Sequence, residues 1–221
     1  MHNIAIDGPA GAGKSTIAKE VAKKLDFIYV DTGAMYRAMA LYFLRQGIAA
    51  EEEEKIAAAC DDVQVSIAYE GGEQQVLLGE ENVNDFIRTE EVSMMTSNIS
   101  KYAAVREKLL HLQRELAATQ NVVMDGRDIG TCVLPHADVK IYLTASAAER
   151  ARRRYKELID RGGDCDLDQI EKDIIARDEQ DMNRKISPLC QAADAVFVDS
   201  SNLTIEQVVA EIIGIYGEKT Y

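Results

Sequence analysis

The chain has 221 residues, of which 47% are hydrophobic, 29% are charged and only 3 are proline. This composition excludes the disordered, collagen-like and disulfide-scaffold classes, and the length suits one globular domain with an insertion or two small domains. Acidic residues outnumber basic ones by 38 to 25, giving a formal net charge of −13. A field of this sign argues against duplex nucleic acid and anionic membranes as partners.

The cysteines and histidines suggest neither a zinc site nor a disulfide framework. No two of the four cysteines form a CxxC pair, and the three histidines lie far apart in the sequence. No apolar run approaches the ~18 residues that a membrane-spanning helix needs, and the N-terminal sequence lacks the pattern of a secretion signal. We therefore expect a cytoplasmic protein with free thiols.

Five short apolar runs are predicted to be strands, at 3–7, 27–31, 121–125, 139–144 and 195–199. Helical stretches are predicted at 14–25, 34–46, 145–161, 167–184 and 204–217. Continuous apolar runs are typical of parallel strands with both faces covered by helices. The predicted fold class is α/β, with a doubly wound, five-stranded parallel sheet flanked by helices.

The segment 61–84 interrupts this alternation. Val63, Val65 and Ile67 alternate with more polar or small residues, and Gly71 and Gly72 then supply a turn before an apolar return. Such a pattern predicts an antiparallel hairpin, followed by helical sequence over 85–119. A substrate-capping lobe and a decorative surface insertion both stay open as interpretations. We expect one domain over 1–221, with its core in 1–60 and 85–221.

Residues 8–15 read Gly-Pro-Ala-Gly-Ala-Gly-Lys-Ser and match the phosphate-loop pattern GxxxxGK[ST] between a predicted strand and a predicted helix. The glycines let backbone N–H groups approach a phosphate, Lys14 supplies a charge for its oxygens, and the Ser15 hydroxyl can ligate Mg²⁺. The motif makes the predicted sheet one of the phosphate-loop NTPase type. No NKxD element for guanine follows, which argues against a GTPase. We expect ATP and Mg²⁺, with the nucleotide bound by Gly8, Pro9, Ala10, Gly11, Ala12, Gly13, Lys14, Ser15 and Thr16.

Charged residues gather after two later strands and on one helix. Arg37 lies in the first turn after the strand 27–31, where it suits a clamp on a monoester phosphate, although a surface arginine explains it as well. The segment 125–128, Asp-Gly-Arg-Asp, closes another strand with a charge density that is costly unless it binds something. Arg177, Asp181 and Arg184 share one helix face, as a binding surface or an internal ion-pair stripe.

The segment 149–161 holds the one strong basic cluster of this acidic chain, and Gly162 and Gly163 follow it. It is predicted to form a lid, at about 150–165, over the phosphates of ATP, with the glycine pair as a hinge. A solvated helix face is the alternative. The candidates for ATP contact are Arg150, Arg153 and Arg154.

Taken together, six blocks of this sequence resemble the bacterial cytidylate kinases of the nucleoside monophosphate kinase superfamily. The blocks are IAIDGPAGAGKST at 4–16, DTGAMYR at 31–37, IRTEEV at 87–92, VREKLLHLQR at 105–114, DGRDIGT at 125–131 and RDEQDMNR at 177–184. They span nearly the whole chain in the family's order. Many functions share the phosphate loop, whereas the later blocks together are specific to this family.

The resemblance implies that ATP phosphorylates CMP, and also dCMP, in pyrimidine nucleotide metabolism. It assigns the monophosphate to Arg37, Arg127 and Arg184, the sugar to Arg177 and Asp181, and the cytosine ring to Ser97, Arg106 and Asp128. Thr32, where some relatives carry serine, keeps its hydroxyl and joins this substrate site. Lys14, Arg127 and Arg184 are the expected catalytic residues, Arg153 the expected lid contact, and Ser15 the metal ligand. Asp125 is either a further ligand or acts through water.

The chemistry of the base agrees with this assignment. Asp128 can accept from the cytosine N4 amine and Arg106 can donate toward O2 and N3, whereas uracil would present an acceptor to Asp128 at a cost of about 1–3 kcal/mol. Two other functions stay open: a kinase for another acceptor such as UMP or AMP, and an ATPase switch that controls a partner. The sequence holds no coiled coil or spare apolar stripe, so we expect a monomer.

Overall fold

The structure is a computed structural model that describes residues 1–160 and 162–220. It divides into two compact units. The first comprises residues 1 and 28–122, and the second comprises residues 2–27 and those described from 123 onward.

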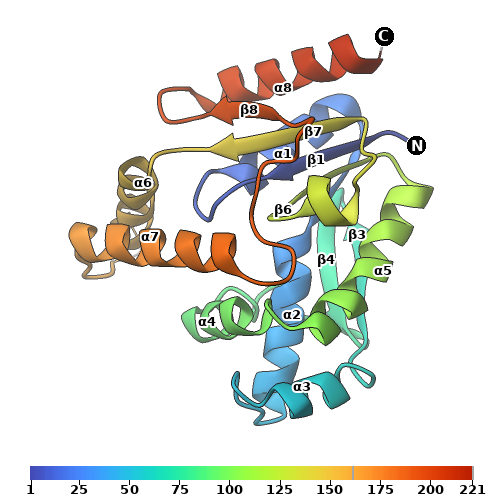
Figure 1. Ribbon diagram of the computed structural model, residues 1–221, viewed down its shortest axis with the longest axis vertical. Coiled ribbons are helices and arrows are strands. Elements are labelled where there is room, and N and C mark those ends of the chain that lie inside the picture. The colour runs from blue at the N-terminus through green and yellow to red at the C-terminus, as the bar shows by residue number, and fades with distance from the viewer. Residues whose placement is uncertain (161, 221) are drawn as a thin grey trace. The chain divides into compact units, whose positions relative to one another are not determined.

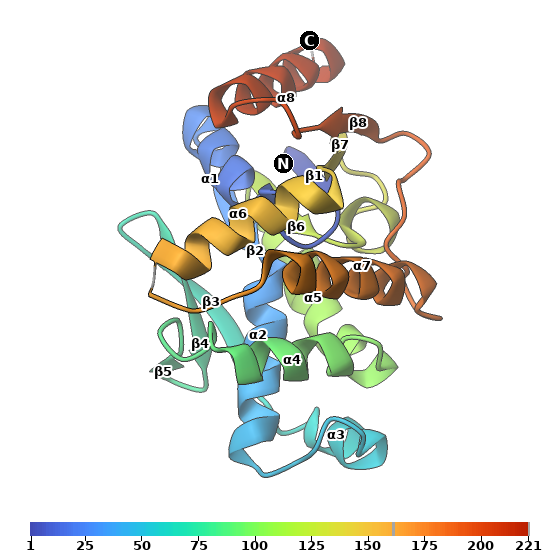
Figure 2. The same cartoon turned by 90° about the vertical axis from the view of Figure 1, so that its left-hand side faces the viewer.

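The main sheet has five strands in the order β2-β6-β1-β7-β8. Figure 1 labels β1, β6, β7 and β8, and Figure 2 also labels β2. They are β1 (Asn3–Asp7), β2 (Ile28–Asp31), β6 (Val122–Gly126), β7 (Val139–Thr144) and β8 (Val196–Asp199). In parallel pairing, Ile4 lies opposite Val139 and Ile141 opposite Val196. The predicted α/β class and its five-stranded parallel sheet are therefore confirmed.

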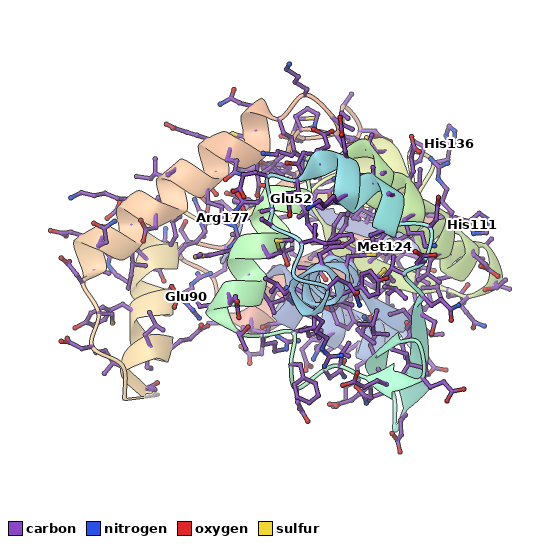
Figure 3. All side chains as sticks on the ribbon, turned by 90° about the horizontal axis from the view of Figure 1, so that it is seen from below. Glu52, Glu90, His111, Met124, His136 and Arg177 are labelled. Atoms are coloured by element: carbon purple, nitrogen blue, oxygen red, sulfur yellow. The ribbon has the colours of Figure 1, made fainter. Side chains whose placement is uncertain are left out.

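The second unit contains the helices α1 (Lys14–Leu25), α6 (Ala147–Asp160), α7 (Leu167–Asn183) and α8 (Ile205–Thr220), and the π-helical turn η1 (Ile129–Val133). Helices α1 and α8 pack together over β1 and β7, and α6 lies beside α7 (Figures 1 and 2). Ile6, Ile141 and Met124 are buried in the core, and Figure 3 labels Met124. Residue 161, where the predicted helix 145–161 ends, lies outside the described residues.

The first unit contains the helices α2 (Thr32–Arg45), α3 (Glu53–Ala59), α4 (Glu90–Ile99) and α5 (Ala103–Thr119) and the strands β3 (Val65–Glu70), β4 (Glu73–Leu78) and β5 (Glu81–Asn82). β3 and β4 form the predicted antiparallel hairpin, with Ile67 opposite Val76, and β5 adds a short third strand. Gly71 and Gly72 make the turn at positive φ of 59° and 82°, where glycine is favoured. This small sheet lies alongside α2 (Figures 1 and 2).

The helical sequence predicted for 85–119 is interrupted in the structure. It forms α4 and α5, with a break at Ser100–Tyr102. Tyr102 donates from its hydroxyl to the carbonyl of Ala50, 2.9 Å away, and so ties the start of α5 to the chain ahead of α3. Over residues 1–160 and 162–220, none of the helices combines the length and the apolar character needed to cross a membrane.

Candidate active site

The phosphate loop of residues 8–15 joins β1 to α1 in the second unit. Gly8 has a φ of 153°, and a Cβ built there would lie 1.9 Å from the carbonyl oxygen of Leu143. Gly13 forms the N-cap of α1 with a φ of 84°. Only glycine tolerates the close approach at position 8, and the loop leads directly to the helix N-terminus. This arrangement suits a phosphate, because the first N–H groups of a helix have no partner within it.

Lys14 is buried in the loop. Its Nζ donates to the carbonyl of Pro9, 2.8 Å away. Burial lowers the pKa of Lys14, and the Arg127 guanidinium lowers it further, while Asp125 and Asp7 act in the opposite direction. A desolvated ammonium is therefore held beside the loop backbone, where an anion would stabilise its charge.

Ser15 and Asp125 contact each other at the N-terminal end of α1. The Ser15 hydroxyl donates to Oδ2 of Asp125, 3.0 Å away, and Asp125 is buried within β6. A hydroxyl and a carboxylate are hard oxygen ligands of the kind that Mg²⁺ prefers. In the part of the chain that the structure describes, no three His, Cys, Asp or Glu residues gather as a metal site. The pair therefore fits a Mg²⁺ ion that takes its remaining ligands from phosphate and water.

Asp7, the last residue of β1, fixes the loop that follows β6. Its two carboxylate oxygens accept from the backbone N–H groups of Ile129 and Gly130, both at 2.7 Å. Burial raises the pKa of Asp7 to about 6, although these two hydrogen bonds act to lower it. The start of η1 is thereby held in place directly after Arg127 and Asp128.

Four charged residues form a network within the second unit. Arg127 donates from Nε to Oδ2 of Asp181, 2.8 Å away. Arg184 lies 3.8 Å from Oδ1 of Asp181 and 3.9 Å from Oδ1 of Asp128. Burial acts to raise the pKa of Asp181, but the nearby arginines, Arg127 first, outweigh it and hold the pKa below its usual range. Asp181 therefore stays ionised and orients Arg127.

This network combines the two interpretations of the predicted α7 face. Ion pairs are present, as the stripe interpretation expects, and Arg177 extends from the same helix (Figure 3). Arg127 and Arg184 carry guanidinium groups of the kind that bind phosphate through paired hydrogen bonds, so the same face also suits an anion.

The three candidate lid arginines have different surroundings. Arg150 is buried and donates to the carbonyls of Ala10 and Ala145, at 3.0 and 2.9 Å, and pairs through both Nη atoms with Asp178 of α7. Arg153 donates to the Ser200 carbonyl at 2.9 Å, and its Nη1 lies 3.9 Å from a Cβ built on Gly13. The third, Arg154, is half exposed and pairs with Glu157. Arg153 is thus beside the phosphate loop, while Arg150 binds the loop's own backbone.

In the first unit, Asp31 gathers two arginines at the start of α2. Its Oδ1 caps the helix by accepting from the N–H of Ala34, 2.8 Å away. Its Oδ2 lies 3.1 Å from Nη2 of Arg37 and 3.8 Å from Nη2 of Arg88. Among the residues that the structure describes, Nε of Arg37 is buried and has no hydrogen-bond partner. A buried donor of this kind points to an external acceptor. Thr32, also assigned to the substrate, is buried in the same turn.

Two of the three residues assigned to the base also belong to the first unit. Arg106 donates to the carbonyl of Ser100, 3.2 Å away, and its guanidinium lies over the Tyr36 ring, 5.7 Å from the centroid. The hydroxyl of Ser100 in turn donates to the carbonyl of Ser97, 3.0 Å away. Ser97 and Arg106 are therefore linked through the break between α4 and α5. The third residue, Asp128, belongs to the second unit.

With this geometry in place, comparison with known proteins decides the family. The model of the cytidylate kinase family matches residues 4–218. The chain belongs to the cytidylate kinase family. The cytidylate kinase of Caldicellulosiruptor saccharolyticus is 51% identical over 97% of this chain and 95% of its own length. That of Ligilactobacillus salivarius is 50% identical over 99% of this chain and 97% of its own length.

Among solved structures, the chain is similar to an uncharacterized protein from Eubacterium ventriosum, with 11% identity and a TM-score of 0.52 over 98% of this chain and 99% of that one. A similarity at this level of identity concerns the fold alone. The predicted membership of the cytidylate kinase family is thus confirmed by the sequence relatives.

In this cytidylate kinase family member, four contributors to the site lay outside the residues assigned from sequence: Asp7, Gln74, Arg88 and Asp178. Arg88 stands in the block at 87–92 and Asp178 in the block at 177–184, so both were within the family pattern without a role. Asp7 ends the strand before the phosphate loop. Gln74 carried no signal, because its amide bonds to Asp31, 43 residues away in the chain.

Proposed function

We propose that this protein is a cytidylate kinase that transfers the γ-phosphoryl group of ATP to the 5′-phosphate of CMP, giving CDP and ADP, and that dCMP is a second acceptor. The observation that carries the proposal is the family match over residues 4–218, at about half identity to cytidylate kinases. Charged groups gather around the phosphate loop, around Asp31 and around Asp181. We propose that they supply the phosphate binding and the electrostatic stabilisation that such a transfer needs.

On the ATP side, the residues 8–16 are proposed to hold the triphosphate through their backbone N–H groups. Lys14 stabilises the charge on the β- and γ-phosphate oxygens, and Arg153, close to Gly13, extends over the nucleotide. Ser15 and Asp125 would hold Mg²⁺, which when bound neutralises phosphate charge during the transfer. The 3.0 Å hydrogen bond between them supports this assignment.

On the acceptor side, Arg37, Arg127 and Arg184 are proposed to hold the monophosphate. The buried Nε of Arg37, which has no hydrogen-bond partner in the described part of the chain, supports this role. The hydrogen bond to Asp181 orients Arg127 for the same purpose. The remaining assignments follow the resemblance: Arg177 and Asp181 to the sugar, Ser97, Arg106 and Asp128 to the cytosine ring, and Thr32 to the substrate.

The transfer needs no covalent enzyme intermediate. Catalysis comes from alignment and from electrostatic stabilisation of the transferred group by Lys14, Arg127 and Arg184. We propose a single domain over 1–221 in which the hairpin 61–84 belongs to the monophosphate-binding lobe and about 150–165 forms the lid. Closure of both excludes water and so suppresses hydrolysis of ATP. A monomeric cytoplasmic enzyme is the form that we propose.

The test is ADP release with Mg-ATP against CMP, dCMP, UMP, AMP and GMP, each beside a blank without acceptor. Rapid ADP formation with CMP and dCMP, at a rate far above the blank, is the expected result. A higher rate with UMP or AMP would assign the enzyme to another acceptor. Equal ADP formation in the blank would favour an ATPase switch instead.

A further inference from the structure

The inserted small sheet reaches the start of α2 through a single side chain. Oε1 of Gln74, on β4, accepts from the backbone N–H of Asp31 at 2.8 Å, and its Nε2 donates to the carbonyl of Asp31 at 3.3 Å. A primary amide offers one acceptor and a donor side by side, so it satisfies both backbone groups of one residue. Both partners belong to the first unit.

The residue that Gln74 holds is the one that orients the arginines. The Asp31 carboxylate caps α2 at Ala34 and lies 3.1 Å from Arg37 and 3.8 Å from Arg88. Because one carboxylate makes all these contacts, a shift of the Asp31 backbone moves the Arg37 guanidinium with it. A displacement near 1 Å is enough to impair the alignment of a binding group.

Gln74 is itself fixed within the small sheet. The Asn84 side chain donates to the carbonyl of Gln74 at 2.9 Å and accepts from the N–H of Val76 at 3.0 Å. A second attachment lies nearby, where the Tyr69 hydroxyl donates to the carbonyl of Tyr29 at 3.1 Å. The hairpin is therefore anchored to the end of β2 at two points, and Gln74 provides the one next to Arg37.

We propose that Gln74 is a positioning residue for the monophosphate of CMP: it fixes the backbone of Asp31, and Asp31 fixes Arg37. The proposal rests on the proposed role of Arg37 in holding the monophosphate. It gives the inserted sheet a share in substrate affinity, which a decorative insertion would not have. Gln74 itself need not touch the substrate.

The first experiment compares Gln74→Ala with Gln75→Ala in the full-length enzyme. Gln75 is the matched control, because it precedes Val76 on the same strand and accepts only from Asn82 and Asn84 of the small sheet among the hydrogen bonds described for it. Gln74→Ala is expected to raise the KM for CMP roughly tenfold and to leave the KM for ATP within about twofold, since two hydrogen bonds on the acceptor side are lost. Gln75→Ala is expected to change neither constant. A KM for CMP in Gln74→Ala that equals the wild-type value would overturn the proposal.

A second variant guards against simple loss of folding. Gln74→Met keeps the length of the side chain and removes both hydrogen bonds, so it is expected to give the same rise in the KM for CMP. Thermal melting of each variant shows whether the enzyme assayed is folded. A folded Gln74→Met enzyme with the wild-type KM for CMP would overturn the proposal.

The route through Arg37 is tested by a double-mutant cycle. In an Arg37→Ala background, Gln74→Ala is expected to add little to the KM for CMP, because the group that it positions is gone. If Gln74→Ala raised the KM for CMP by the same factor in the wild-type and the Arg37→Ala backgrounds, the proposed route would be overturned. Arg37→Ala by itself tests the proposed function, because an unchanged KM for CMP in that variant would refute the role of Arg37. If Arg37→Ala raised the KM for CMP while Gln74→Ala kept the wild-type value, only the role of Gln74 would be refuted.

Discussion

The Ser15 hydroxyl donates to the Asp125 carboxylate at 3.0 Å, across 110 residues of sequence. Ser15 lies in the first turn of α1 and Asp125 lies in β6. The packing of the helix on the sheet therefore sets the distance between the two side chains. Both are hard oxygen groups of the kind that would suit a Mg²⁺ ion with its other ligands from water and phosphate. This pair leads to the first prediction.

Asp125→Asn is expected to raise the Mg²⁺ concentration that gives half-maximal activity by about tenfold or more, because it removes a charged oxygen from the metal site. A Mg²⁺ titration of ADP release measures this value. Asp62→Asn, an exposed aspartate, is the control and keeps the wild-type curve. An unaltered Mg²⁺ dependence in Asp125→Asn would remove Asp125 from the metal site.

Lys14→Ala is expected to lower kcat by roughly 10²–10³, the usual cost of losing one preorganised electrostatic contact to the transition state. Its free energy of unfolding is expected to change little, because burial already disfavours the charged form and lowers the pKa of Lys14. Turnover and urea unfolding are measured on the same preparation, with exposed Lys23→Ala as control. Wild-type turnover would exclude Lys14 from catalysis.

Asp128→Asn is expected to reduce the preference for CMP over UMP by roughly tenfold, since an asparagine can turn its NH₂ group toward the uracil O4. The quantity to measure is the ratio of kcat/KM for the two acceptors. The KM for ATP serves as the internal control and is expected to stay the same. A preserved ratio would mean that other residues read the exocyclic group of the base.

The pKa of Asp7 predicts a pH dependence of stability. Because it is raised from 3.8 to about 6, the folded protein binds the proton more tightly than the unfolded chain, and this contribution to stability declines as pH rises from about 4 to 6. The difference in unfolding free energy between wild type and Asp7→Asn is expected to shift against wild type by about 1 kcal/mol from pH 5 to pH 7.

Urea unfolding at several pH values measures this difference, and subtraction of the variant removes the effect of all other carboxylates. A difference that stays constant across the range would show that the Asp7 carboxyl is already ionised at pH 5. A difference that moves in favour of wild type as pH rises would reverse the sign of the pKa shift.

Local sequence determined much of the main sheet. The strands at 3–7 and 139–144 and the helix at 14–25 have the predicted bounds, because each is a continuous apolar or periodic run ended by a clear change of composition. The break between α4 and α5 has no glycine or proline to mark it. The break depends on contacts with residues distant in the sequence, such as the hydrogen bond from Tyr102 to Ala50.

The same contrast holds within the candidate site. The phosphate loop is contiguous, so its eight residues could be recognised in one reading of the sequence. The support of Arg127 and Asp128 could not, because Asp7 binds the N–H groups of Ile129 and Gly130 across more than a hundred residues. The π-helical turn begins at the same two N–H groups, Ile129 and Gly130, that this buried carboxylate binds.

The side chain of Arg150 anchors the first turn of α6, and the later part of the helix has more exposed ion pairs. A rigid swing of the entire helix would have to break three hydrogen bonds at once, one to the Ala10 carbonyl and two to Asp178. Farther along, the pair between Arg154 and Glu157 is exposed and easily exchanged with water. Arg150 therefore ties the start of α6 both to the phosphate loop and to α7, so that the shape of the loop and the placing of these two helices depend on one guanidinium group.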